Sequence, residues 1–139
     1  MWQLGGLLEL QLTSGARMSF DALYGLELTD CSDSLVRGRV RVRGELTQSA
    51  GLIHGGVYSA ISEALAARGT ACAVGPEGRL AVALSHQTTT LHPITHGTIH
   101  ATAVPRHRGR TTWVWEVEIA DDDGLVCVAG RVTVAVRDA

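Results

Sequence analysis

The sequence predicts an α+β domain in which a curved antiparallel sheet wraps around one long central helix. From Val57 to Ala67, apolar residues recur three and four positions apart, which is the spacing of a buried helix face. After this helix, four segments alternate apolar with polar residues or are rich in β-branched residues, as strands are. No repeat or linker divides the 139 residues, so we expect a single domain.

The composition excludes several classes of protein. Hydrophobic residues make up 45% of the chain and charged residues 19%, which predicts a soluble globular protein. The formal net charge of −2 gives no general attraction to nucleic acid, so no nucleic-acid partner is expected. The apolar opening segment is broken by Gly5, Gly6 and Glu9 and is too short to span a bilayer. We therefore expect neither an export signal nor a membrane partner.

The cysteine content indicates a reducing environment. Cys31, Cys72 and Cys127 are too few and too widely spaced for a disulfide framework or a metal-binding pair. This pattern suits the cytoplasm, where we expect the protein to be located. The expected role of all three thiols is packing.

Local patterns place the elements along the chain. Residues 1–17 show no clear period and are expected to form a loosely ordered N-terminal arm, whereas residues 18–139 form the domain. A short helix is predicted within residues 18–26, a strand from Asp33 to Arg43, and a long helix that starts near Gly55. The four later strands are predicted at residues 79–91, 98–104, 111–120 and 125–137. Four strands in succession predict antiparallel hairpins.

Arginines alternate with valines on the strand before the long helix. Arg37, Arg39, Arg41 and Arg43 share one face of it. These side chains either bind phosphate groups or form a solvated outer face that also discourages edge pairing. We favour the solvated face.

The start of the long helix combines several polar groups that are suited to catalysis. His54 precedes Gly55 and Gly56, whose backbone N–H groups lie at the positive end of the helix dipole with no side chain to block a ligand. Glu63 follows two turns later among small residues, and Gln48 supplies an amide in the preceding loop. The group as a whole predicts a site for a substrate that develops negative charge.

Other site types lack the required context. His92, His96 and His100 are four positions apart, but proline and glycine lie between them, so they are not aligned on a helix for zinc. Ser59 and Ser62 are not part of a GxSxG motif, and no nucleotide-binding glycine motif is present. We expect no metal and no cofactor.

The pattern Gln48-x5-His54-Gly55-Gly56-x6-Glu63 resembles the active-site signature of hotdog-fold acyl-CoA thioesterases. It is similar to the PaaI-like group and to the 4-hydroxybenzoyl-CoA thioesterases that carry glutamate on the central helix. The similarity includes residues 51–66 and 107–128 and spans most of the chain from about Gly25 onward. The resemblance implies a hotdog fold, an acyl-CoA substrate, and a homodimer as the minimal active unit within a homotetramer.

The resemblance also implies roles for the site residues. Glu63 either attacks the thioester carbonyl or activates water, and the Gly55 amide stabilises the oxyanion. Gln48 and His54 orient the carbonyl. The alternative role for Glu63 is an exposed helix residue paired with a base such as Arg68.

The implied substrate is an aromatic acyl-CoA, either aryl or arylacetyl. Ala67 and His92 stand where the 4-hydroxybenzoyl-CoA branch carries threonine and arginine. A 1,4-dihydroxy-2-naphthoyl-CoA or fatty acyl-CoA substrate therefore stays open, as does a non-catalytic acyl-CoA sensor.

Binding residues are expected at both ends of the substrate. Basic and hydroxyl residues at the predicted turn of residues 105–112 suit the CoA phosphates, and residues near the helix start suit the acyl group. These residues are Arg106, Arg108, Arg110, Thr111 and Thr112 for CoA, and Gly56 and Tyr58 for the acyl end. Gly55 and Glu63, eight positions apart, are separated by about 12 Å along one helix, which predicts a site built from two subunits.

Overall fold

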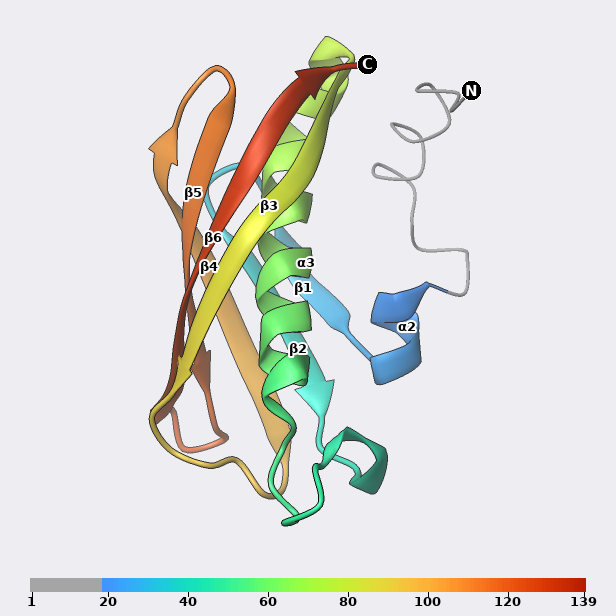
Figure 1. Cartoon of the computed structure of the whole chain (residues 1–139), viewed down its shortest axis with the longest axis vertical. Helices are drawn as coiled ribbons and strands as arrows, with labels where there is room; N and C mark the ends of the chain where they lie inside the picture. Colours follow the sequence, from blue (N-terminus) through green and yellow to red (C-terminus); the bar gives the residue numbers. More distant parts are fainter. Residues whose placement is uncertain (1–18) are drawn as a thin grey trace.

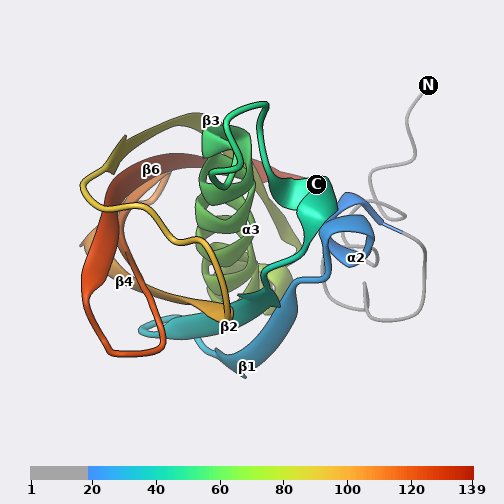
Figure 2. The same cartoon turned by 90° about the horizontal axis from the view of Figure 1, so that it is seen from below.

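Helix α3 (Gly55–Val74) runs along the molecule, and a six-stranded antiparallel sheet curls around it (Figure 1). The computed structural model describes residues 19–139. The expected arm of residues 1–17 lies outside the described residues. Figure 2 shows the sheet surrounding the helix on three sides, while α2 (Phe20–Tyr24) lies beside the remaining side. The predicted α+β plan is confirmed.

The strands follow in the order that the sequence predicts, with one addition. Strand β1 (Glu27–Cys31) precedes the arginine-bearing strand β2 (Val36–Arg41), and the short 3-10 turn η2 (Gly44–Leu46) leads towards α3. A second 3-10 turn, η3 (Gly75–Glu77), ends the helix. The last four strands are β3 (Arg79–Thr90), β4 (Thr98–Arg108), β5 (Thr112–Ala120) and β6 (Val126–Asp138).

The expected succession of hairpins is wrong for β3. The sheet order is β1-β2-β4-β5-β6-β3, so β4, β5 and β6 form hairpins, but β3 pairs with β6 and lies at the far edge. Strand β4 pairs instead with β2. Alternation within a strand specifies its buried face and carries no information about which strand lies beside it, so the sequence pattern could not reveal this crossover.

Strand β4 is also longer than predicted. It continues through Pro105 to Arg108, with an irregularity in its pairing to β5 between Pro105 and His107. A proline lacks the N–H needed for a ladder hydrogen bond and is accommodated at such a bulge. The turn that was predicted at residues 105–112 is therefore confined to the few residues between β4 and β5.

The core lies between α3 and the inner face of the sheet. Trp115, at the centre of β5, is fully buried beneath the helix. Its indole Nε1 donates a hydrogen bond of 2.9 Å to Thr70 Oγ1, and that hydroxyl donates to Ala66 O at 2.9 Å. A Cβ added at Gly69 would lie 2.8 Å from Val36 Cγ2 and closer still to the Trp115 ring. Gly69 therefore lets the helix approach the indole closely.

The packing role expected of the cysteines holds only for Cys127, which is buried. Cys31 on β1 and Cys72 on α3 are both exposed, with their Sγ atoms 3.2 Å apart. Their juxtaposition arises because β1 lies across the helix, a contact that the spacing of the cysteines in sequence could not show. Partial burial of its sulfur and the adjacent Cys72 thiol raise the pKa of Cys31 to about 12.

Among the described residues, no helix is both long enough and apolar enough to cross a membrane.

We predict that Gly69→Ala destabilises the fold. The added methyl group must displace a fully buried, hydrogen-bonded tryptophan, which should lower the free energy of unfolding by about 1–3 kcal/mol. Urea unfolding followed by circular dichroism measures the change. Gly55→Ala on the same helix is the matched control, because a Cβ there meets no heavy atom within 4 Å. A Gly69→Ala protein as stable as the Gly55→Ala control would contradict the prediction.

Candidate active site

The start of α3 is capped by the side chain of His54. His54 Nδ1 accepts a hydrogen bond of 2.8 Å from the Gly56 N–H, as N-cap side chains do at helix starts. Because Nδ1 is the acceptor, the neutral ring carries its proton on Nε2 and presents an N–H donor there. The His54 O atom also accepts from Val57 N at 2.9 Å. The histidine is thus fixed by the helix that it caps.

The two glycine amides are not equivalent, although both were predicted to be exposed donors. The Gly56 N–H is used by the His54 cap, whereas the Gly55 N–H has no acceptor within the described part of the chain. Gly55 is exposed, and an added Cβ would find no heavy atom within 4 Å. The helix start therefore offers one free donor, that of Gly55, to an incoming oxygen atom.

Gln48 lies in the loop that feeds this helix. Its backbone N–H donates to Leu52 O at 2.8 Å and its backbone carbonyl accepts from Gly51 N at 2.9 Å, so the loop folds back on itself. The side-chain carbonyl of Gln48 accepts from Ala50 N. This bond fixes the amide group and leaves its NH₂ donors available.

Glu63 lies on the side of α3 that the sheet does not cover. Its side chain is 49% exposed, and its Oε2 lies 3.5 Å from His86 Nε2 on β3. The partner is thus His86 and not Arg68, the base considered from the sequence. Ala60 and Ala67, one turn to either side of Glu63, are only half-buried. The carboxylate is held beside the edge strand and stays accessible.

Sequence reasoning missed His86. Its alternating strand context gives no local signal, because the residue comes 23 positions after Glu63 and meets it only through the packing of β3 against α3. An imidazole 3.5 Å away can orient the carboxylate.

The basic residues expected to bind CoA are only partly available. Arg106 Nε lies 3.1 Å from Glu116, and Arg108 Nη2 lies 2.7 Å from Asp33. The Arg108 guanidinium also stacks over Trp113, 4.6 Å from the ring centroid. Both arginines belong to β4 and not to a turn, which corrects the predicted position.

Arg110 differs from its two neighbours. It is exposed in the turn between β4 and β5 and has no ion-pair partner among residues 19–139. Thr111 is exposed beside it, and Thr112 begins β5. This turn is the part of the predicted cluster that is free to meet a phosphate.

Tyr58, expected to line an acyl pocket, is 2% exposed and belongs to the core. Burial raises the pKa of its hydroxyl, and a hydrogen bond with the Ile94 backbone partly offsets the effect. Little of the ring is left for a ligand to contact in a single chain.

A family model described as the thioesterase superfamily matches residues 50–128, which is more than half of the chain. The chain belongs to the thioesterase superfamily. The matched region starts in the loop before α3 and ends within β6, so it contains His54, Gly55 and Glu63. Gln48 lies just before it.

Related thioesterase-superfamily proteins match most of the chain. The Mycobacterium tuberculosis protein Rv1847 is 35% identical over 115 residues, covering 81% of this chain and 82% of the relative. Its solved structure has a TM-score of 0.83 at 34% identity and covers 86% of this chain and 97% of its own. The proofreading thioesterase EntH of Cronobacter turicensis is 30% identical over 119 residues, covering 81% of each protein.

Solved variants of the Staphylococcus aureus thioesterase SAV0944 are also similar. One has a TM-score of 0.83 at 26% identity and covers 87% of this chain and 100% of its own. Two such variants replace a glutamate and a glutamine, 15 positions apart, with alanine. Together the comparisons confirm the hotdog fold and establish the protein as a thioester hydrolase of this superfamily.

We predict that the cap and the donor function of His54 can be separated. His54→Ala removes the acceptor for the Gly56 N–H and should destabilise the protein by about 1 kcal/mol. His54→Asn should keep most of the stability, because asparagine is a good N-cap, while it loses the imidazole Nε2–H. Thermal unfolding of the two variants measures the difference. If both substitutions destabilise the protein equally, the stability lost in His54→Ala does not come from the cap.

Proposed function

We propose that the protein hydrolyses the thioester of an aromatic acyl-CoA, either aryl or arylacetyl. The observation that carries the proposal is the placement of two complementary groups on one helix. Gly55 offers an unpaired N–H at the helix start, and Glu63 offers an accessible carboxylate two turns later. A thioester needs both a donor for the developing oxyanion and an oxygen nucleophile or base. The aromatic class rests on the resemblance of the Gln48–Glu63 pattern to the 4-hydroxybenzoyl-CoA branch.

In this mechanism the carbonyl oxygen of the substrate accepts from the Gly55 N–H. The donor is fixed before the reaction and lies at the positive end of the helix dipole, so it stabilises negative charge as the carbonyl is attacked. The Gln48 NH₂ group and the His54 Nε2–H are the further donors that orient the same carbonyl. The paired alanine variants of SAV0944 support pairing the glutamine with the acid, because Gln48 and Glu63 have the same spacing of 15 positions.

Glu63 supplies the other half of the chemistry. Its carboxylate either attacks the carbonyl carbon to form an acyl anhydride, which water then hydrolyses, or takes a proton from the attacking water. In both routes the C–S bond breaks and CoA leaves as the thiolate, which then takes up a proton. His86, 3.5 Å from Glu63, acts as a positioning residue for the carboxylate.

The phosphate end of CoA is proposed to bind at the turn after β4. Arg110 is the main cation there, with Thr111 and Thr112 as hydroxyl donors. Arg106 and Arg108 contribute less, because each already faces a carboxylate.

A dimer is proposed as the minimal active unit. Along one helix, Gly55 and Glu63 are about 12 Å apart, so one carbonyl cannot reach both. Two copies of α3 running antiparallel across a two-fold axis would bring Gly55 of one chain opposite Glu63 of the other. The half-buried alanines beside Glu63 leave room for this approach, and the edge strand β3 exposes Leu84 at 60%. Two such dimers are proposed to form a tetramer.

We predict that Glu63→Gln abolishes thioester hydrolysis while the fold is retained. Loss of the acid should lower kcat by about 10²–10⁴-fold, the usual contribution of such a group. The release of free thiol from benzoyl-CoA, phenylacetyl-CoA and palmitoyl-CoA provides the assay. Glu77→Gln, the same charge change at an exposed position beyond the other end of α3, is the control and should retain activity.

The same assay tests the substrate class. Wild-type protein should turn over the two aromatic esters faster than palmitoyl-CoA, and a preference for palmitoyl-CoA would contradict the aromatic assignment. Tight binding of the esters without thiol release would favour an acyl-CoA sensor. Glu63→Gln activity within a few-fold of wild type would overturn the role of Glu63.

We predict that activity returns when two inactive variants share a dimer. Gln48→Ala and Glu63→Ala proteins, unfolded and refolded together, should form mixed dimers in which one of the two sites is fully wild type. With random pairing, about a quarter of all sites are restored. Mass spectrometry verifies that mixed dimers have formed. Verified mixed dimers with no activity above that of the parents would place both groups in one chain and exclude the shared site.

A further inference from the structure

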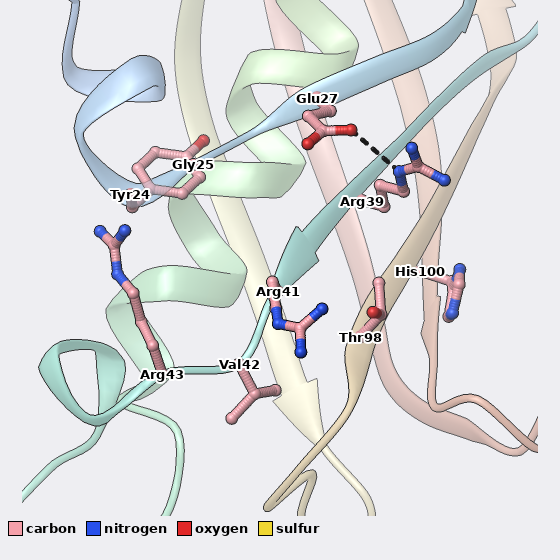
Figure 3. Close-up of a pocket in the computed structure, with 9 residues that line it drawn as sticks. All are labelled: Tyr24, Gly25, Glu27, Arg39, Arg41, Val42, Arg43, Thr98 and His100. Atoms are coloured by element: carbon pink, nitrogen blue, oxygen red, sulfur yellow. Dashed lines mark hydrogen bonds and ion pairs between the residues drawn. The ribbon is translucent and has the colours of Figure 1, made fainter.

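A basic pocket lies between α2, the ends of β1 and β2, and β4 (Figure 3). Its volume of about 560 Å³ falls within the range of about 300–1,000 Å³ that is typical of small-molecule sites. Most of the polar groups that line it are donors. The lining residues are Tyr24, Gly25, Glu27, Arg39, Arg41, Val42, Arg43, Thr98 and His100.

The arginines of β2 that line the pocket point away from α3. Along β2, Val36, Gly38 and Val40 are buried towards α3, so Arg39 and Arg41 between them point to the outer face. Figure 3 shows β1 and β2 in front of α3, with the arginine side chains on the viewer's side. Glu63 belongs to α3, so Arg39 and Arg41 do not share a face of the sheet with it.

One of the three arginines in the pocket lacks a counter-charge. Arg39 Nε lies 3.0 Å from Glu27 Oε2, and Arg43 Nε lies 3.8 Å from Glu45 while its Nη2 donates to Leu23 O at 2.6 Å. Arg41 has neither an ion pair nor a hydrogen-bond partner in the described range of 19–139. Its guanidinium is therefore the cation of the pocket whose hydrogen-bond donors are left for an anion.

Neighbouring side chains supply further donors at the same place. Across the ladder, Arg41 faces Thr98 and Arg39 faces His100. Adjacent residues on one face of a sheet lie close enough to contact the same group. His100 uses Nε2 in a hydrogen bond of 2.8 Å with Asp122 Oδ1, which holds its ring in place. The Thr98 hydroxyl and the Arg41 guanidinium are thus left to bind one ligand.

We propose that this basic pocket binds a small phosphorylated metabolite, with the phosphate held by Arg41 and Thr98. A phosphate offers three acceptor oxygens and carries about −1.5 to −2 charges, enough to satisfy Arg41 and attract the flanking cations. A carboxylate has only two oxygens, so it would engage Arg41 with fewer acceptors left for the other donors that line the pocket. The number of donors in the pocket therefore favours phosphate over carboxylate ligands.

Binding of inorganic pyrophosphate, measured by isothermal titration calorimetry at low ionic strength, tests the proposal. Arg41→Gln should weaken binding by about tenfold or more, because it removes charged hydrogen bonds. Thr98→Val should weaken binding by a smaller factor. Arg37→Gln is the matched control: it lies on the same face of the same strand, pairs with Asp30 at 3.8 Å, and lies outside the pocket. It should leave the affinity within twofold.

Two further measurements separate this pocket from other anion sites. Pyrophosphate bound at Arg110, the cation proposed for the CoA phosphates, is recognised by its loss in Arg110→Gln, whereas binding in the pocket should persist in that variant and be weakened in Arg41→Gln. Acetate, with a single carboxylate, should bind more weakly than pyrophosphate to wild-type protein. Four results would each overturn the proposal: no pyrophosphate binding, equal losses in Arg41→Gln and Arg37→Gln, binding that is lost only in Arg110→Gln, or tighter binding of acetate. Circular dichroism confirms that each variant keeps its fold, and none of these readouts depends on thioester hydrolysis.

Discussion

Helix α3 reaches its position because Gly69 leaves room for the ring of Trp115. The indole is fully buried at the centre of the sheet and is held by its hydrogen bond to Thr70 on the same turn of the helix. A close contact and a hydrogen bond at one point define both the depth and the rotation of the helix against the sheet. The positions of the α3 residues that are accessible to a substrate depend on this contact between Gly69 and Trp115.

The rotation of α3 decides which of its residues are accessible. Apolar and small residues also occur outside the buried face predicted for residues 57–67, so the sequence of the helix does not fix its rotation against the sheet. With the Trp115 side fixed against the sheet, Glu63 is directed to the uncovered side beside the edge strand β3. The start of the helix, where Gly55 lies, projects beyond the buried part and is capped by His54. The same packing therefore leaves the Glu63 carboxylate and the Gly55 N–H accessible to a second copy of the helix.

The outer face of the sheet has a different character. Arginines there are mostly compensated: Arg37 by Asp30, Arg39 by Glu27 and Arg108 by Asp33. Exposed pairs of this kind contribute little to stability, because water screens them and ordering the side chains costs entropy. Arg41 and Arg110 have no such ion pair within residues 19–139. They are the cations proposed to bind phosphate groups.

The sequence by itself determined the long helix, its start at Gly55 and the strands that follow it. These features depend on local periodicity and on the chemistry of neighbouring residues, which a single chain displays directly. Tertiary structure decided that β3 pairs with β6 and that His86 meets Glu63. Both are contacts between residues far apart in the sequence, and no local pattern encodes which element packs beside which.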